Sequence, residues 1–177
     1  MHARMIPNLF SKMLLPHNIP PTMKVVVRSL QRCKSKKECL AKAYAIITEK
    51  NHGSSYKTYL LLHRVFQTNI DELWKQRGFM HCTTMNYLLR VLLVKSGHFN
   101  DDDITLGRTH VWGSIHQYLI VRIGKTFINI DPWSRTYGVV FGQYLHGFPL
   151  GIIFQNFQTR QDRVVSHRAH QQRAHRQ

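Results

Sequence analysis

GFMHCTTMNYLLRVLLVKSG, residues 78–97, is an apolar run bounded by a glycine at each end. Apolar side chains recur in it at the spacing of one helical face, which predicts a helix whose buried face begins with Cys82. The free N–H groups of a helix N-terminus carry partial positive charge, which stabilises a thiolate over a thiol. We therefore predict a helix that opens on an activated cysteine, and we expect the domain to be organised around it.

A histidine and an aspartate follow on two predicted strands. Gly124-Lys125 is typical of a two-residue hairpin turn, and the stretches on either side of it, residues 115–123 and 126–130, are rich in apolar and β-branched residues. With that turn, His116 lies diagonally beside Asp131 on one face of the hairpin. The carboxylate could then hold one imidazole nitrogen while the other nitrogen meets the thiol. Cys82, His116 and Asp131 thus form a complete nucleophilic set.

These residues resemble the transglutaminase-like superfamily of papain-fold enzymes. The resemblance rests on Arg77-Gly78 ahead of the cysteine helix, on His116 at a strand start, and on the segment FINIDP that contains Asp131. It covers about residues 54–133, and the three parts together are more specific than any one alone. It implies an α+β papain-like fold, helical in its N-terminal half, with the nucleophile at a helix N-terminus packed on a small antiparallel sheet.

Two positions and one neighbouring family qualify the resemblance. The superfamily usually has an aromatic residue soon after its histidine, a place that Tyr118 fills, and a small residue after Asp-Pro, where this chain has Trp133. Arg77-Gly78 and Asn86 also resemble arylamine N-acetyltransferases, which use a Cys-His-Asp set. Those enzymes carry an added domain for which this chain has no room, so the transglutaminase-like core is the better match.

The function implied by the resemblance is acyl transfer or hydrolysis at a peptide or glutamine-type amide, by a cysteine peptidase, amidase or transglutaminase. Cys82 would attack the carbonyl, His116 would take and return the proton, and Asp131 would orient the imidazole. The Cys82 backbone N–H, with a side-chain donor from Gln76 or Trp74, is the candidate oxyanion stabiliser. We expect a protein or peptide substrate and no cofactor.

Two alternatives involve the same region. Zinc could use side chains of the types found at His81, Cys82, His110, His116 and Asp131. Adjacent residues on a helix point about 100° apart, so His81 and Cys82 do not easily converge on one ion. The chain also has no Cys-x-x-Cys pair, and we expect no metal site. The second alternative is a catalytically inactive papain-fold binding module with a basic surface that attracts polyanions.

Composition bounds the domain organisation. A chain of 177 residues with 43% hydrophobic content predicts one compact domain. We expect a flexible N-terminal arm over residues 1–22, the transglutaminase-like domain over 23–154 and a basic polar tail over 155–177.

The cysteine content favours a reducing compartment, because three cysteines leave at least one unpaired. A disulfide between Cys33 and Cys39 is the alternative that the sequence leaves open. No secretory signal or membrane-spanning run is visible, so we expect a cytoplasmic monomer.

Several further elements are predicted around the central helix. Helices are expected from residue 23, from residue 35 with Ser35 as its cap, and from residue 54 to 66. The sheet is expected to begin with a strand over residues 104–112. The acidic run just before it, residues 101–103, lacks the glycine and the distant carboxylate of a calcium loop, so we do not predict calcium binding there.

The net charge of +16 is concentrated outside the predicted catalytic region. Residues 1–50 contribute +8, residues 51–154 contribute +4 and residues 155–177 contribute +4. Such an excess attracts polyanions, although no nucleic-acid-binding motif accompanies it. We expect weak polyanion binding without sequence preference.

Overall fold

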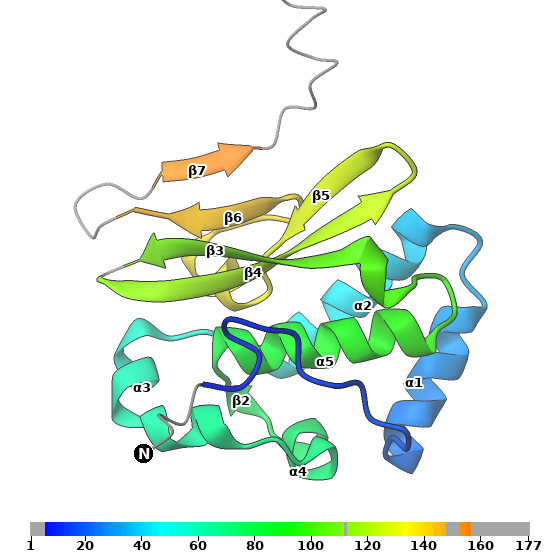
Figure 1. Cartoon of the computed structure of the whole chain (residues 1–177), viewed down its shortest axis with the longest axis horizontal. Helices are drawn as coiled ribbons and strands as arrows, with labels where there is room; N and C mark the ends of the chain where they lie inside the picture. Colours follow the sequence, from blue (N-terminus) through cyan, green and yellow to red (C-terminus); the bar gives the residue numbers. More distant parts are fainter. Residues whose placement is uncertain (1–5, 112, 148–152, 157–177) are drawn as a thin grey trace, which may run out of the picture.

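The computed structural model describes residues 6–111, 113–147 and 153–156. Helices dominate the first half and strands the second (Figure 1), so the α+β class expected from the sequence is confirmed. None of the helices in the described ranges has the length and apolarity needed to cross a membrane. In chain order the elements are α1 (Pro21–Gln31), α2 (Lys36–Lys50), β1 (Asn51–His52), α3 (Ser55–Leu60), η1 (Leu62–Phe66), α4 (Ile70–Lys75), β2 (Gly78–Phe79), α5 (Cys82–Lys95), η2 (Asp101–Asp103), β3 (Ile104–Val111), β4 (Ser114–Ile123), β5 (Thr126–Ile130), η3 (Trp133–Tyr137), β6 (Gln143–His146) and β7 (Ile153–Asn156), where η marks a 3₁₀-helix.

Helix α5 lies at the centre of the fold (Figure 1). Helices α1, α2 and α4 contact it, and strand β4 contacts it from the sheet. Every residue from Thr83 to Leu93 is buried. The expectation of a single inward face is therefore wrong: a helix enclosed on all sides buries its polar residues too, provided that these find hydrogen-bond partners.

The main sheet is antiparallel, with strand order β3-β4-β5. The β4–β5 hairpin turns at Gly124-Lys125, and Ile123 pairs with Thr126, as the turn composition predicted. Gly124 has a φ of +61°, in the left-handed region that glycine enters without a steric penalty. The predicted register is thus confirmed, and it is this register that places the predicted histidine near the predicted aspartate.

Two smaller strand pairs flank the main sheet. Strand β1 pairs in parallel with β2, and β2 leads the chain into α5. Strand β6 pairs with β7 and contacts β3 and β5 of the main sheet. The tail predicted over residues 155–177 lies outside the described residues, apart from the last two residues of β7.

The helices before α5 follow their predicted starts more closely than their predicted ends. Helix α2 begins where Ser35 accepts a hydrogen bond of 3.1 Å from the Glu38 backbone N–H. The helix predicted over 54–66 is capped by Ser54 but breaks at Leu61, where α3 gives way to η1. Helix α3 has no buried residue, so little packing supports its continuation as a regular helix.

Residues 6–20 form no helix or strand, yet they pack along α5, where Figure 1 shows them in dark blue. Arg90 of α5 is fully buried and donates to Asn8 Oδ1 at 3.2 Å, to Asp101 Oδ1 at 2.7 Å and to the Met13 carbonyl. A buried guanidinium is costly unless it is paired in this way. The segment expected to be part of a flexible arm therefore supplies hydrogen-bond partners to the core.

Two aspartates of the acidic run before β3, Asp101 and Asp103, form ion pairs within the protein. Asp103 accepts from Lys36 at 3.0 Å and from Arg122 at 2.8 Å, and these two hydrogen bonds lower the pKa of Asp103 to about 2. Asp101 accepts from Arg90. The run therefore ties the start of the sheet to α2 and α5.

Candidate active site

The structure brings the three predicted catalytic residues together from three elements. Cys82 is the first residue of α5, His116 is the third residue of β4, and Asp131 directly follows β5. His116 and Asp131 are 3% and 1% exposed, whereas Cys82 is only partly buried. The acid–base pair is thus shielded from water, and the sulfur remains accessible.

A short hydrogen bond joins the imidazole to the carboxylate. His116 Nε2 lies 2.7 Å from Asp131 Oδ2. Burial by itself lowers the pKa of His116, but the charge and hydrogen bond of Asp131, and then the hydrogen bond with the Cys82 side chain, raise it to about 10. Because Nε2 faces the carboxylate, Nδ1 is the ring nitrogen left for the sulfur.

Two groups that the sequence interpretation missed complete the surroundings of Asp131. The fully buried Ser134 places its Oγ 2.7 Å from Asp131 Oδ2 and 3.2 Å from His116 Nε2, and its backbone N–H donates to Asp131 Oδ1 at 3.2 Å. The Leu145 backbone N–H of β6 donates to Asp131 Oδ2 at 3.0 Å. Three protein donors besides the imidazole therefore fix the carboxylate, which in turn fixes the ring.

Trp133 lies against the His116 imidazole. Its ring centroid is 5.0 Å from that of His116, with the planes tilted by 49°, and the side chain is 4% exposed. On its other side it packs against Gly53, where an added Cβ would lie 2.4 Å from the indole ring. Trp133, at a position where the sequence resemblance led us to expect a small residue, thus covers the His116 imidazole.

A narrow crevice opens over the sulfur. Cys82, His116 and Trp133 line it together with residues of α3 and of the β3–β4 hairpin. Its free volume is about 20 Å³, room for about one water molecule. A substrate group that reaches the sulfur must therefore be slender, or α3 and the hairpin must part to admit it.

The two side chains proposed to stabilise an oxyanion have other partners. Trp74 Nε1 donates to Thr22 Oγ1 at 3.1 Å, and Gln76 Nε2 donates to the Phe79 carbonyl at 2.9 Å. Neither residue lines the crevice. The Cys82 backbone N–H keeps its candidate role, because the first N–H of a helix has no acceptor within the helix.

The zinc alternative does not fit the geometry of these residues. His81 directs Nε2 to the Leu61 carbonyl at 3.0 Å and packs edge-on against Phe79 at 5.0 Å. Burial lowers the pKa of His81, and the carbonyl of Leu61 takes up one of its two ring nitrogens. Within the described part of the chain, no group of three or more His, Cys, Asp or Glu residues could hold a metal ion.

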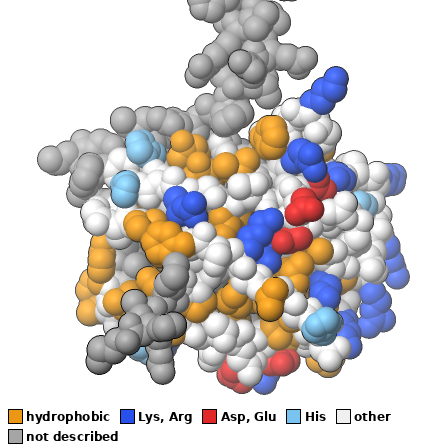
Figure 2. Space-filling model, viewed as in Figure 1, with side chains coloured by type: hydrophobic (Ala, Val, Ile, Leu, Met, Phe, Trp, Pro, Cys, Tyr) orange, Lys and Arg blue, Asp and Glu red, His pale blue; other side chains and the backbone are white. Residues whose placement is uncertain are grey.

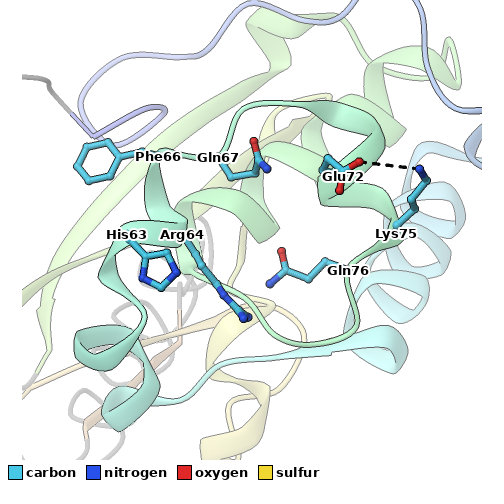
Figure 3. A pocket seen from close by; sticks show the side chains of 7 residues that line it. All are labelled: His63, Arg64, Phe66, Gln67, Glu72, Lys75 and Gln76. Carbon is cyan, nitrogen blue, oxygen red and sulfur yellow. Dashed lines mark ion pairs between the residues drawn. The ribbon is translucent and has the colours of Figure 1, made fainter.

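A larger cavity of about 620 Å³ lies between η1 and α4, away from the sulfur (Figure 3). Figure 3 shows Arg64 and Gln76 pointing into the same space, with Glu72 paired to Lys75 at one side, at 3.9 Å. Its lining includes one histidine but no cysteine, serine or threonine that could act as a nucleophile. This cavity is larger than the crevice over the sulfur, but its described lining does not combine a thiol or hydroxyl nucleophile with a base.

The surface charge is unevenly distributed. On the face drawn in Figure 2, many Lys and Arg side chains gather over the side of α1 and α2, while apolar side chains are prominent on the side of α3 and the β3–β4 hairpin. The crevice opens between α3 and that hairpin. On this face (Figure 2), the side on which the crevice opens shows fewer Lys and Arg side chains than the side of α1 and α2.

The chain matches no family model, no curated protein and no solved structure.

Proposed function

We propose that the protein is a transglutaminase-like cysteine enzyme with a papain-like core, which performs acyl transfer or hydrolysis on a peptide or glutamine-type amide. The observation that carries the proposal is the 2.7 Å bond between His116 Nε2 and Asp131, with Cys82 on the other side of the same imidazole. A nucleophile, a base and an orienting carboxylate in this order are what nucleophilic catalysis requires.

In the first half-reaction, the Cys82 sulfur forms a bond to the carbonyl carbon and the carbon–oxygen double bond opens to an oxyanion. The Cys82 backbone N–H, at the start of α5, is placed to stabilise that oxyanion. The tetrahedral species collapses by breaking the carbon–nitrogen bond. His116 gives the departing amine or ammonia the proton that came from the thiol, and a thioester remains.

In the second half-reaction, water or an amine attacks the thioester carbon while His116 accepts the proton of the attacking group. The carbon–sulfur bond then breaks and the proton returns to Cys82. Water yields a carboxylic acid, whereas a primary amine yields a new amide. The free volume above the sulfur, about 20 Å³, has room for about one water molecule, so the crevice must widen to hold the acyl group together with the attacking water or amine.

Asp131 and Ser134 orient the imidazole in this mechanism. The carboxylate accepts from Nε2, so the ring turns Nδ1 toward the sulfur, and the ion pair supports the imidazolium that forms in each half-reaction. Ser134 donates to the same carboxylate oxygen and contacts the ring. Four hydrogen bonds to Asp131 preorganise the pair before substrate arrives.

The test measures ammonia release and amine incorporation on glutamine-containing peptides. We expect activity in the unaltered protein and none in Cys82→Ala. The control is Cys33→Ala, which removes a thiol outside the site and should keep full activity. The melting temperature of Cys82→Ala should stay close to that of the unaltered protein, because one small side chain replaces another. Undiminished turnover in Cys82→Ala would rule out this nucleophile.

The net charge of +16 supports a second candidate, a non-catalytic binding module for polyanions. It predicts tight duplex binding and no acyl transfer. Titration with salt separates the two candidates: weak, strongly salt-dependent and sequence-independent binding is expected of the enzyme, whereas a tight, sequence-selective complex would favour the binding module.

A further inference from the structure

We propose that a cavity beside the catalytic crevice is a carboxylate-binding subsite, which selects an acidic side chain of a peptide substrate next to the reacting amide. The proposal rests on the proposed acyl-transfer function and adds the substrate class. The cavity has a free volume of about 450 Å³ and is lined by Phe10, Arg108, Thr109, His110, Ile115, Tyr144 and His146.

The cavity and the crevice are neighbours. Ile115 lines both of them, and it directly precedes the catalytic His116 in β4. In the sheet register, Thr109 of the cavity pairs with His116, and His110 pairs with Ile115. Paired strands lie about 4.8 Å apart. A substrate bound at the sulfur can therefore reach the cavity with the side chain of an adjacent residue.

The polar groups of the cavity suit an anion. Arg108 is a permanent cation, His110 and His146 present imidazoles, and none of the described residues that line the cavity is Asp or Glu. The Arg108 guanidinium is held in place because its Nη1 donates to the Leu9 and Phe10 carbonyls, at 3.3 and 3.2 Å. An anchored guanidinium is well suited to carboxylate, which it can bind through several N–H groups.

The walls of the cavity are built as a rigid frame. Tyr144 stacks on Tyr118 with ring centroids 4.1 Å apart and planes 11° apart. Tyr118 in turn lies so close to Gly107 that an added Cβ there would be 2.4 Å from its ring. The hydroxyl of Thr109 is hydrogen-bonded to Nδ1 of His146, which leaves Nε2 as the nitrogen available to a ligand.

A peptide side chain fits these features better than a nucleic acid does. The volume lies within the range of ordinary small-ligand pockets, about 300–1,000 Å³. Polynucleotide binding depends on a row of cations that follows successive phosphates, whereas this cavity is a partly open hollow whose described lining offers one arginine and two histidines. Aspartate or glutamate beside the reacting amide is the ligand that matches its charge and size.

The experiment compares Cys82 alkylation by two probes, chloroacetyl-glutamate amide and chloroacetyl-glutamine amide, which differ only in the charge of one side chain. Mass spectrometry gives the second-order labelling rate of each probe on the full chain. We expect the glutamate probe to react about tenfold faster, the scale that one hydrogen bond between charged groups supplies. Added salt should reduce this ratio.

Variants test whether the cavity is responsible. Arg108→Gln and, separately, His110→Gln should bring the ratio of the two rates toward one, whereas Arg64→Gln in the other cavity should leave it unchanged. Unfolded molecules would react with both probes alike and would also bring the ratio toward one, so the folded fraction of each variant is measured by circular dichroism and the ratio is compared only among fully folded samples. Equal rapid labelling by both probes, or a ratio that persists in Arg108→Gln and His110→Gln, would overturn the subsite while leaving the nucleophile intact. Failure of both probes to label Cys82 faster than Cys33 would remove the proposed function itself.

Discussion

Replacing Asp131 by asparagine is the most informative perturbation of the site, because the residue binds four donors and its charge holds the imidazolium. The side-chain amide of asparagine has only one oxygen that accepts hydrogen bonds. Its NH₂ group would face N–H or O–H donors that are hydrogen-bonded to a carboxylate oxygen in the unaltered protein. Breaking a buried ion pair of this kind costs about 3–5 kcal/mol. We expect Asp131→Asn to lower the free energy of unfolding by that amount near neutral pH.

The loss should depend on pH in a definite direction. The folded pKa of His116 is raised to about 10, above the value of about 6.5 in an unfolded chain. The folded state therefore binds the proton more tightly, and this contribution to stability is fully present below pH about 6.5 and is lost as pH rises toward about 10. The difference between the unaltered protein and Asp131→Asn should shrink by up to about 1.4 kcal/mol per pH unit across that window.

Urea unfolding of both proteins at several pH values between neutrality and 10 measures this difference directly. A destabilisation that stays constant across that range would show that His116 carries no stabilising proton in the folded state. Turnover should also fall, by roughly 10⁴-fold if Asp131 acts as the aspartate of a serine-protease triad does. A variant that keeps the rate of the unaltered protein would show that Asp131 does not orient the base.

Three other perturbations test the surroundings of the site. Ser134→Ala removes a 2.7 Å hydrogen bond to the Asp131 carboxylate and should cost about 1.5–3 kcal/mol of stability by urea unfolding, with little pH dependence; a loss below about 0.5 kcal/mol would contradict the role assigned to its hydroxyl. Gly53→Ala places a Cβ against Trp133 and should cost about 1–3 kcal/mol; an unchanged melting temperature would mean that the packing is looser than described. Iodoacetamide at pH 6 should label Cys82 first, because Cys33 and Cys39 are buried and burial raises the pKa of Cys39; comparable labelling of either would argue against an activated sulfur.

The pairing of His116 with Asp131 could be predicted because it depends on local sequence. A two-residue turn at Gly124 fixes the hairpin register, and the register fixes which side chains share a face. The start of α5 at Cys82 was likewise predicted from local periodicity. The short-range contacts that were missed are the two hydrogen bonds from Ser134 to Asp131, one from its backbone N–H and one from its hydroxyl, although an aspartate three residues before a free N–H is a recognisable capping pattern.

The other missed contacts join residues that are far apart in the chain. Leu145 reaches Asp131 only because β6 crosses to the main sheet, and Gly53 meets Trp133 only because β1 lies beside η3. Periodicity and capping signals carry no information about such pairs. The enclosure of α5 was missed for the same reason, since two of the three partners of its buried Arg90, Asn8 and Met13, come from a segment that has no secondary structure.

A covalent acyl-enzyme on Cys82, with His116 as its proton carrier, can be observed by mass spectrometry of the intact protein quenched during incubation with a glutamine-containing peptide. We expect a thioester on Cys82 that adds the mass of the peptide less one ammonia, present in the unaltered protein and absent from Cys82→Ala. An adduct that persists in Cys82→Ala, or turnover of the peptide through an adduct on another residue, would contradict this expectation.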